Sequence, residues 1–134
     1  MPTNPDQPFA QLGYDIIGAA MVVYNELGGG LSEEIYQESF EIELAERGFD
    51  FVAQPELVVY FKGRPLKKRL RPDLMIESEV VVELKAVSAL CEEHRAQLLN
   101  YLRVTQKKVG YLINFAAFPN VECQRLVNTR LPKV

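Results

Sequence analysis

The chain has 134 residues, of which 48% are hydrophobic and 25% are charged, so it is long enough for one compact domain with a real core and too short for two. Its formal net charge of −3 gives no overall positive field, which argues against a tight, purely electrostatic DNA binder. Any contact with nucleic acid must therefore come from a local basic patch or be bridged by metal ions.

The first eight residues include three prolines and several polar side chains, which predicts a loose arm ahead of the folded domain. The start of the chain lacks the basic-then-apolar pattern of a signal peptide, and no apolar run approaches the roughly 20 residues of a membrane span. Cys91 and Cys123 form no CxxC pair and have no histidine at zinc-ligand spacing, so free thiols are the simpler interpretation. We therefore expect a soluble, cytoplasmic protein without membrane contact.

Two helices are predicted in the first third of the chain. Over residues 14–27 apolar residues recur at helical spacing, and the glycines at 28–30 stop the helix. The apolar stripe of this helix must be covered by the domain's own sheet or by a second subunit, which leaves a homodimer open. Ser32 is a suitable N-cap for a second helix that runs to about Arg47, with Gly48 as its C-cap.

One glutamate of the second helix, Glu33, falls on its inward stripe. Three large side chains share that stripe: Tyr36, Phe40 and Leu44. Three other glutamates of this helix belong to the opposite, solvated face: Glu34, Glu38 and Glu41. Two roles for Glu33 are open, a first-turn acid favoured by the helix dipole or an acid of a functional site.

A three-stranded antiparallel meander is predicted over about residues 51–87. Residues 57–61 are strand-forming, residues 62–65 form a turn, and residues 66–71 lead into the next strand. This region holds the one concentrated basic patch in the sequence: Arg64, Lys67, Lys68, Arg69 and Arg71. The patch is either a solvated hairpin that balances nearby acids or a rim that contacts phosphates, with Arg69 and Arg71 as its candidate nucleic-acid ligands.

The chain is organised around residues 72–85, where two short apolar runs flank a polar break and predict a β-hairpin. Side chains alternate along a strand, so Glu83 and Lys85 point the same way in a strand whose neighbours indicate burial on both faces. Pairing within the hairpin would bring the carboxylate of Asp73 beside Glu83. Two converging carboxylates with an ammonium alongside suit a hard divalent cation next to a phosphate.

A third helix is predicted over residues 92–104. Beside its apolar face, another stripe holds His94, Gln97 and Tyr101, and we expect this stripe to face the sheet edge that carries the two carboxylates. His94 is either a hydrogen-bonded surface residue or a group that acts in acid–base chemistry or phosphate contact. Tyr101 is either a core residue or part of the site, and both His94 and Tyr101 are candidates for contact with nucleic acid.

The third helix is a long enough connection to make the strand of Glu83 parallel to an apolar strand over residues 109–115. A last strand over residues 121–127 follows a turn. The predicted fold class is α/β (α+β): a mixed central sheet of about five strands flanked by helices, in the order helix, helix, three strands, helix, two strands.

The charged pattern resembles a known signature. Pro72-Asp73, nine intervening residues and Glu83-Leu84-Lys85 resemble the motif of the PD-(D/E)xK nuclease superfamily. The upstream Gly30, Glu33 and Tyr36 are similar to the GxxExxY group within that superfamily. The resemblance covers residues 13–127 and includes a Gln-x-x-x-Tyr element at residues 97–101. It implies a restriction-endonuclease-like core.

The resemblance also implies a function, the Mg²⁺- or Mn²⁺-dependent hydrolysis of phosphodiester bonds in nucleic acid, with DNA favoured. The implied metal ligands are Asp73, Glu83, the backbone carbonyl of Leu84 and, directly or through water, Glu33. Lys85 would orient or help deprotonate the attacking water and stabilise charge on the phosphate, and Gln97 would position substrate or water.

Two other function classes are open. A nuclease-fold protein could bind nucleic acid or a protein partner without cutting, and an assembly protein could use the apolar first helix as its interface. Such proteins could lose an acid or the lysine, whereas this chain retains Asp73, Glu83 and Lys85. That retention favours the enzyme.

Overall fold

The structure is a computed structural model that describes residues 9–130, so the arm predicted over residues 1–8 lies outside the described part of the chain. The elements follow in the order α1 (Ala10–Leu27), α2 (Glu33–Glu46), β1 (Phe51–Ala53), β2 (Leu57–Phe61), β3 (Arg64–Leu70), β4 (Leu74–Ile76), β5 (Val80–Lys85), α3 (Glu92–Thr105), β6 (Val109–Asn114) and β7 (Glu122–Val127).

A mixed sheet of five strands forms the centre of the fold, in the spatial order β1-β4-β5-β6-β7. β5 and β6 are parallel, and the other neighbouring pairs are antiparallel. α3 makes the crossover between β5 and β6, which is what the long connection predicted. The mixed five-stranded sheet with flanking helices confirms the predicted fold class.

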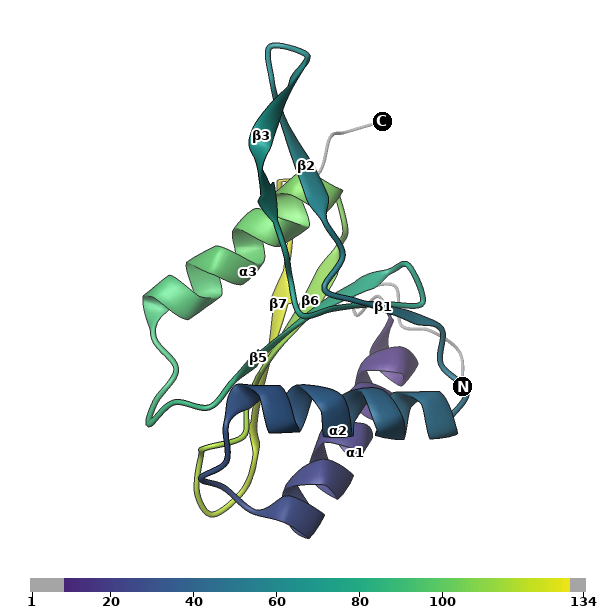
Figure 1. Cartoon of the computed structure of the whole chain (residues 1–134), viewed down its shortest axis with the longest axis vertical. Helices are drawn as coiled ribbons and strands as arrows, with labels where there is room; N and C mark the ends of the chain where they lie inside the picture. The colour runs from purple at the N-terminus through teal and green to yellow at the C-terminus, as the bar shows by residue number, and fades with distance from the viewer. Residues whose placement is uncertain (1–8, 131–134) are drawn as a thin grey trace.

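The predicted meander over residues 51–87 is wrong. β1 pairs with β4, while β2 and β3 pair with each other in a separate two-stranded sheet. The chain breaks between β1 and β2 because Gln54 takes a positive φ of 48° and Pro55 has no N–H to donate. The β2–β3 hairpin therefore leaves the main sheet. The base of the hairpin contacts α3, and its tip projects beyond the rest of the fold (Figure 1).

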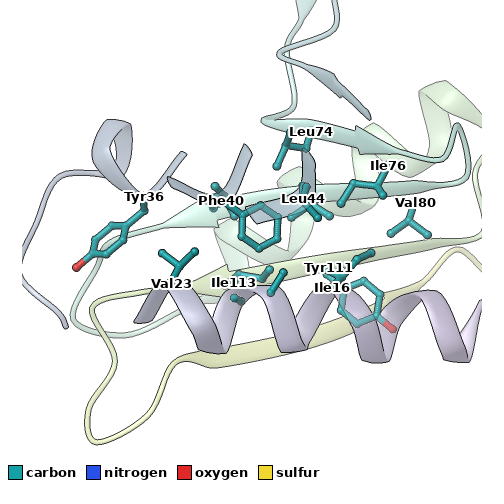
Figure 2. Packing of buried hydrophobic residues seen from close by; sticks show 14 of the residues in the cluster. Ile16, Val23, Tyr36, Phe40, Leu44, Leu74, Ile76, Val80, Tyr111 and Ile113 are labelled. Atoms are coloured by element: carbon teal, nitrogen blue, oxygen red, sulfur yellow. The ribbon is translucent and has the colours of Figure 1, made fainter. Parts of the chain in front are cut away.

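The main sheet lies between two helical layers, with α1 and α2 on one face and α3 on the other (Figure 1). Figure 2 shows the larger core, where side chains of α1, α2 and the sheet meet. Along β5, Val80, Val82 and Leu84 point into this core and Val81 points towards α3. The same alternation places Glu83 and Lys85 on the α3 side.

The apolar stripe of α1 packs into the chain's own core. This was one of two possibilities that the sequence left open, the other being a second subunit. The buried members of the stripe are Ile16, Ala19, Ala20 and Val23. Self-association through α1 therefore stays a prediction. α1 also begins earlier than predicted, after Phe9 in a left-handed conformation with φ 60°. Within residues 9–130, no helix combines the length and the apolar character that crossing a membrane would require.

Both cysteines are free, as predicted, but their surroundings differ. Cys91 is exposed, whereas Cys123 packs against the core and burial raises the pKa of its thiol to about 11. Because the thiolate is the reactive form, we expect a single fast-reacting thiol in the native protein near about pH 8, and none in Cys91→Ser. Ellman's reagent measures both rates. Equally fast reaction of both native thiols would contradict the placement of Cys123.

Candidate active site

Asp73 and Glu83 lie side by side at the open end of the β4–β5 hairpin. The antiparallel register pairs Leu74 with Val82, so the next pair along is Asp73 and Glu83. The main-chain N–H of Asp73 donates to Glu83 Oε1 at 2.8 Å, and the main-chain N–H of Leu84 donates to Asp73 Oδ2 at 2.7 Å. These reciprocal hydrogen bonds fix both carboxylates.

The two carboxylates are held in an environment that disfavours their charge. Glu83 is only 4% exposed. Burial, followed by the neighbouring Asp73 carboxylate, raises the pKa of Glu83 to about 8, although the Asp73 N–H and Lys85 oppose the shift. The pKa of Asp73 is raised mainly by burial, with a further contribution from Glu33. A bound cation would relieve this excess of buried negative charge.

Lys85 joins the carboxylates to α3. Its Nζ lies 3.7 Å from Glu83 Oε2 and donates to Gln97 Oε1 at 3.0 Å. Gln97 Nε2 in turn donates to the hydroxyl of Tyr101 at 3.1 Å. The structure thus brings Lys85, Gln97 and Tyr101 into one polar chain beside Glu83. Tyr101 also packs in the α3 core, which is one of the two roles that the sequence left open, and its role in a functional site stays a prediction.

Asn114, for which no role was predicted, is fully buried and pairs with Lys85 across the parallel strands. Its side-chain oxygen accepts the N–H groups of Val87 and Ala116, each at 3.1 Å, and its amide donates to the Val87 carbonyl at 2.9 Å. Asn114 therefore fixes the chain where it leaves β5 just after Lys85. The signal in the sequence that could have identified Asn114 is its position as a polar residue inside the apolar stretch of residues 109–115.

Gln37 of α2 was also missed. Its Nε2 donates at 3.0 Å to the main-chain carbonyl of Asp73 and at 3.0 Å to Glu41 Oε2. This contact ties α2 to the segment that carries the catalytic candidate Asp73. Gln37 lies four residues before Glu41 on the helix, and Glu41 was assigned to the solvated face, so the sequence offered no clear signal for this contact.

The face of α2 that points to the site is not the predicted one. Glu34, Glu38 and Glu41 were expected on the opposite face from Glu33, yet all four line one open cavity of about 470 Å³. Gln37, Gln54, Asp73 and Leu84 complete the lining. Tyr36, Phe40 and Leu44 are buried in the core and occupy the inward stripe of α2. The neighbouring face of α2, which carries the glutamates, therefore points towards the end of the β4–β5 hairpin.

Glu33 lies in the exposed first turn of α2. It is close enough to raise the pKa of Asp73 and Glu83, but no hydrogen bond joins it to either. In the described part of the chain, no three His, Cys, Asp or Glu side chains converge as a ready metal cluster. A role for Glu33 in metal binding, directly or through water, therefore stays a prediction.

A second open groove, of about 710 Å³, lies on the opposite, basic side. Its lining comes from the hairpin and α3: Glu56, Lys67, Lys68, Arg69, Leu70, Arg71, Gln97 and Tyr101. Arg71 forms an exposed ion pair with Glu56 at 2.8 Å, and Arg69 donates to the carbonyl of Leu66. The candidate nucleic-acid ligands Arg69, Arg71 and Tyr101 thus share one surface that reaches Gln97.

His94 is not part of that groove. Its Nδ1 accepts the main-chain N–H of Cys91 at 3.1 Å and closes a capping box at the start of α3. The structure therefore places His94 in a local structural contact, which was one of its two open roles. It does not join the chain of Lys85, Gln97 and Tyr101.

The donor chemistry of the hairpin end suits a hard divalent cation. Asp73 and Glu83 each use one oxygen for a main-chain N–H, and the second oxygen of Asp73 makes no hydrogen bond within residues 9–130. Leu84 lines the same cavity as Asp73. Two carboxylates and a carbonyl would leave room for water ligands, which Mg²⁺ usually retains.

The family model of the PD-(D/E)XK nuclease superfamily matches residues 10–126. The chain belongs to this superfamily. The crystal structure of SSO0001 is similar to this PD-(D/E)XK chain, with a TM-score of 0.54 and 18% identity over 71% of this chain and 49% of that one. This chain spans about half the length of SSO0001, and the likeness shows the fold alone. No curated protein matches. PD-(D/E)XK proteins are typically nucleases and generally use Mg²⁺ or Mn²⁺.

Proposed function

We propose that this PD-(D/E)XK protein is a Mg²⁺- or Mn²⁺-dependent nuclease that hydrolyses phosphodiester bonds in DNA. One observation carries the proposal: the reciprocally hydrogen-bonded Asp73 and Glu83 have the Lys85 ammonium 3.7 Å from Glu83. A solvated pair of charges would not need such burial, and burial without a function is costly for charged groups.

In the proposed mechanism, Asp73, Glu83 and the Leu84 carbonyl would hold the metal ion, and Glu33 would contribute directly or through water. The bound ion would neutralise charge on the scissile phosphate and lower the pKa of a bound water. Lys85 orients the attacking water and stabilises negative charge that develops on the phosphate. Gln97 holds Lys85 in place because its side-chain oxygen accepts a hydrogen bond from the ammonium.

The distribution of charge around the site supports a direction of substrate approach. Acids of α2 line the cavity on one side of Asp73, and the basic groove ends at Gln97 and Tyr101 on the other. A polyanionic strand is attracted to the basic groove and repelled by the acidic cavity. The substrate backbone is therefore proposed to lie along Arg69 and Arg71 with its scissile phosphate at Lys85.

We further infer that the chain falls in the GxxExxY group, because Gly30, Glu33 and Tyr36 all lie at the turn that leads into α2. Gly30 adopts a φ of 97° that favours glycine. The Tyr36 hydroxyl donates to the Gly28 carbonyl at 2.5 Å and accepts the Leu31 N–H at 3.2 Å. These contacts close the turn ahead of α2 and set the position of Glu33 in its first turn.

The proposal is tested with linear, circular, single-stranded and branched DNA and with RNA, each incubated with Mg²⁺ or Mn²⁺. We expect at least one DNA substrate to be cut by the native protein and spared in EDTA and by Asp73→Ala, since that variant lacks a metal ligand. Calorimetric titration with Mn²⁺ should show weak binding that Asp73→Ala abolishes.

Glu79→Ala is the matched control, because this exposed acid lies in the turn at the other end of the hairpin. Its Mn²⁺ binding and cleavage should equal those of the native protein. Equal heats for the native protein and Asp73→Ala would remove the metal site. If no substrate is cut, a nuclease-fold protein that binds without cleavage becomes the better proposal.

A further inference from the structure

The β2–β3 hairpin ends in two aromatic side chains that residues 9–130 leave largely exposed. Tyr60 is 65% exposed and Phe61 is 62% exposed. Tyr60 pairs with Pro65 and Phe61 with Arg64 across the hairpin, so the two rings lie on opposite faces of the ribbon. The tip lies well away from the main sheet (Figure 1), so these rings do nothing for the core.

The chemistry of the hairpin points to one class of partner. Residues 57–71 contain six Lys or Arg residues and no Asp or Glu, although the whole chain has a net charge of −3. At the tip, Lys62 Nζ lies 5.5 Å from the centroid of the Phe61 ring. Cations interleaved with exposed aromatic rings match a nucleic acid, whose phosphates bind the cations and whose bases stack on the rings.

The hairpin is continuous with the proposed catalytic centre. The groove that begins at Lys67 and Lys68 ends at Gln97, which holds Lys85. From Arg64 to Leu70, β3 extends about 20 Å at about 3.4 Å per residue. That length corresponds to about six nucleotides of one strand at about 3.4 Å each. One nucleic acid can therefore contact the tip and the groove together.

Building on the proposed function, we propose that Tyr60 and Phe61 form a stacking site for unpaired bases. Base faces are available on a single strand, whereas in an intact duplex they are covered by their neighbours. The preferred substrate is therefore DNA in which a single-stranded segment adjoins a duplex, such as a tailed or flapped end. Phosphates lie in the basic groove, and unpaired bases several nucleotides away stack at the tip.

The test measures fluorescence anisotropy in EDTA, so that binding is read without cleavage. The probes are a blunt duplex of about 20 base pairs and the same duplex with a single-stranded tail of about 12 nucleotides, long enough to span the reach of β3. We expect the native protein to prefer the tailed probe. Tyr60→Ala/Phe61→Ala should lose about tenfold or more in affinity for it, with little change for the blunt duplex.

Two controls separate stacking from loss of structure. The swap Tyr60→Phe/Phe61→Tyr keeps both aromatic faces and should bind like the native protein. Tyr14→Ala/Phe118→Ala removes one exposed Tyr and one exposed Phe elsewhere and should also leave binding unchanged. If the alanine pair at the tip binds the tailed probe as tightly as the native protein does, the stacking site is wrong.

The outcomes distinguish this inference from the proposed function. A native protein that cuts DNA with metal but binds blunt and tailed probes equally overturns the stacking site and leaves the nuclease in place. A native protein that binds neither probe overturns the stacking site, and if it also cuts no substrate the proposed function fails as well. Loss of tailed-probe binding confined to the alanine pair at the tip supports the inference.

Discussion

Lys85→Ala is expected to lower metal-dependent DNA cleavage by about a hundredfold or more, with the fold and Mn²⁺ binding retained. The Lys85 ammonium is placed by Gln97 beside the carboxylates, where it can act on water and phosphate and does not ligate the ion. Removing it takes away charge stabilisation that is needed mainly in the transition state.

Metal binding provides a second, independent measurement of the Lys85 variant. Because Lys85 is a cation close to Glu83, its removal should leave Mn²⁺ affinity unchanged or somewhat higher. Asp73→Ala should instead lose both cleavage and Mn²⁺ binding. This split between the two variants distinguishes a group that acts on the substrate from one that holds the ion.

Single-turnover cleavage of the best substrate, with calorimetry and thermal unfolding on the same samples, measures these effects. Lys108→Ala is the matched control, since Lys108 is exposed and far along the chain from the hairpin end. Lys85→Met keeps most of the apolar stem and checks that lost packing is not the cause. Native-like cleavage by Lys85→Ala would end the catalytic assignment of Lys85.

Glu83→Gln is expected to stabilise the metal-free protein at alkaline pH while abolishing metal binding. In the folded protein, burial and Asp73 raise the pKa of Glu83 to about 8, from an ordinary value of 4.5. Between these values the folded state holds a proton that the unfolded state releases. The free energy of unfolding therefore falls as pH rises from about 4.5 to about 8 and stays low above that window.

The glutamine carries no charge, so it removes this loss of stability, and its side-chain oxygen can still accept the Asp73 N–H. In EDTA at about pH 9, the variant should exceed the native protein in unfolding free energy by an amount on the order of a few kcal/mol. At about pH 5 the two should be close. Adding Mn²⁺ at the higher pH should stabilise the native protein and leave the variant unchanged.

Urea denaturation at the two pH values, with and without Mn²⁺, measures all four conditions. Glu79→Gln, an exposed acid in the turn of the same hairpin, should show none of these changes. If the Glu83→Gln protein is less stable than the native protein in EDTA at about pH 9, the buried Glu83 charge does not destabilise the folded state and the prediction is wrong.

Several features of this protein were determined by the sequence alone, because they depend on neighbours along one element. The polar break in residues 72–85 specifies a hairpin, and alternation within β5 places Glu83 and Lys85 on one face. Helical spacing on α3 likewise places Gln97 and Tyr101 on one stripe. These local periods explain why the predicted hairpin and the position of Gln97 agree with the structure, and the length of the α3 connection explains the parallel pairing of β5 and β6.

Only the tertiary structure decided how separate elements meet. β1 pairs with β4 although the β2–β3 hairpin separates them along the chain. Asn114 of β6 and Gln37 of α2 form hydrogen bonds that support the site. α2 turns a flank of glutamates towards Asp73, because burial of its large apolar side chains against the sheet sets its rotation. Such choices depend on packing between layers, which no period within one helix or strand reports.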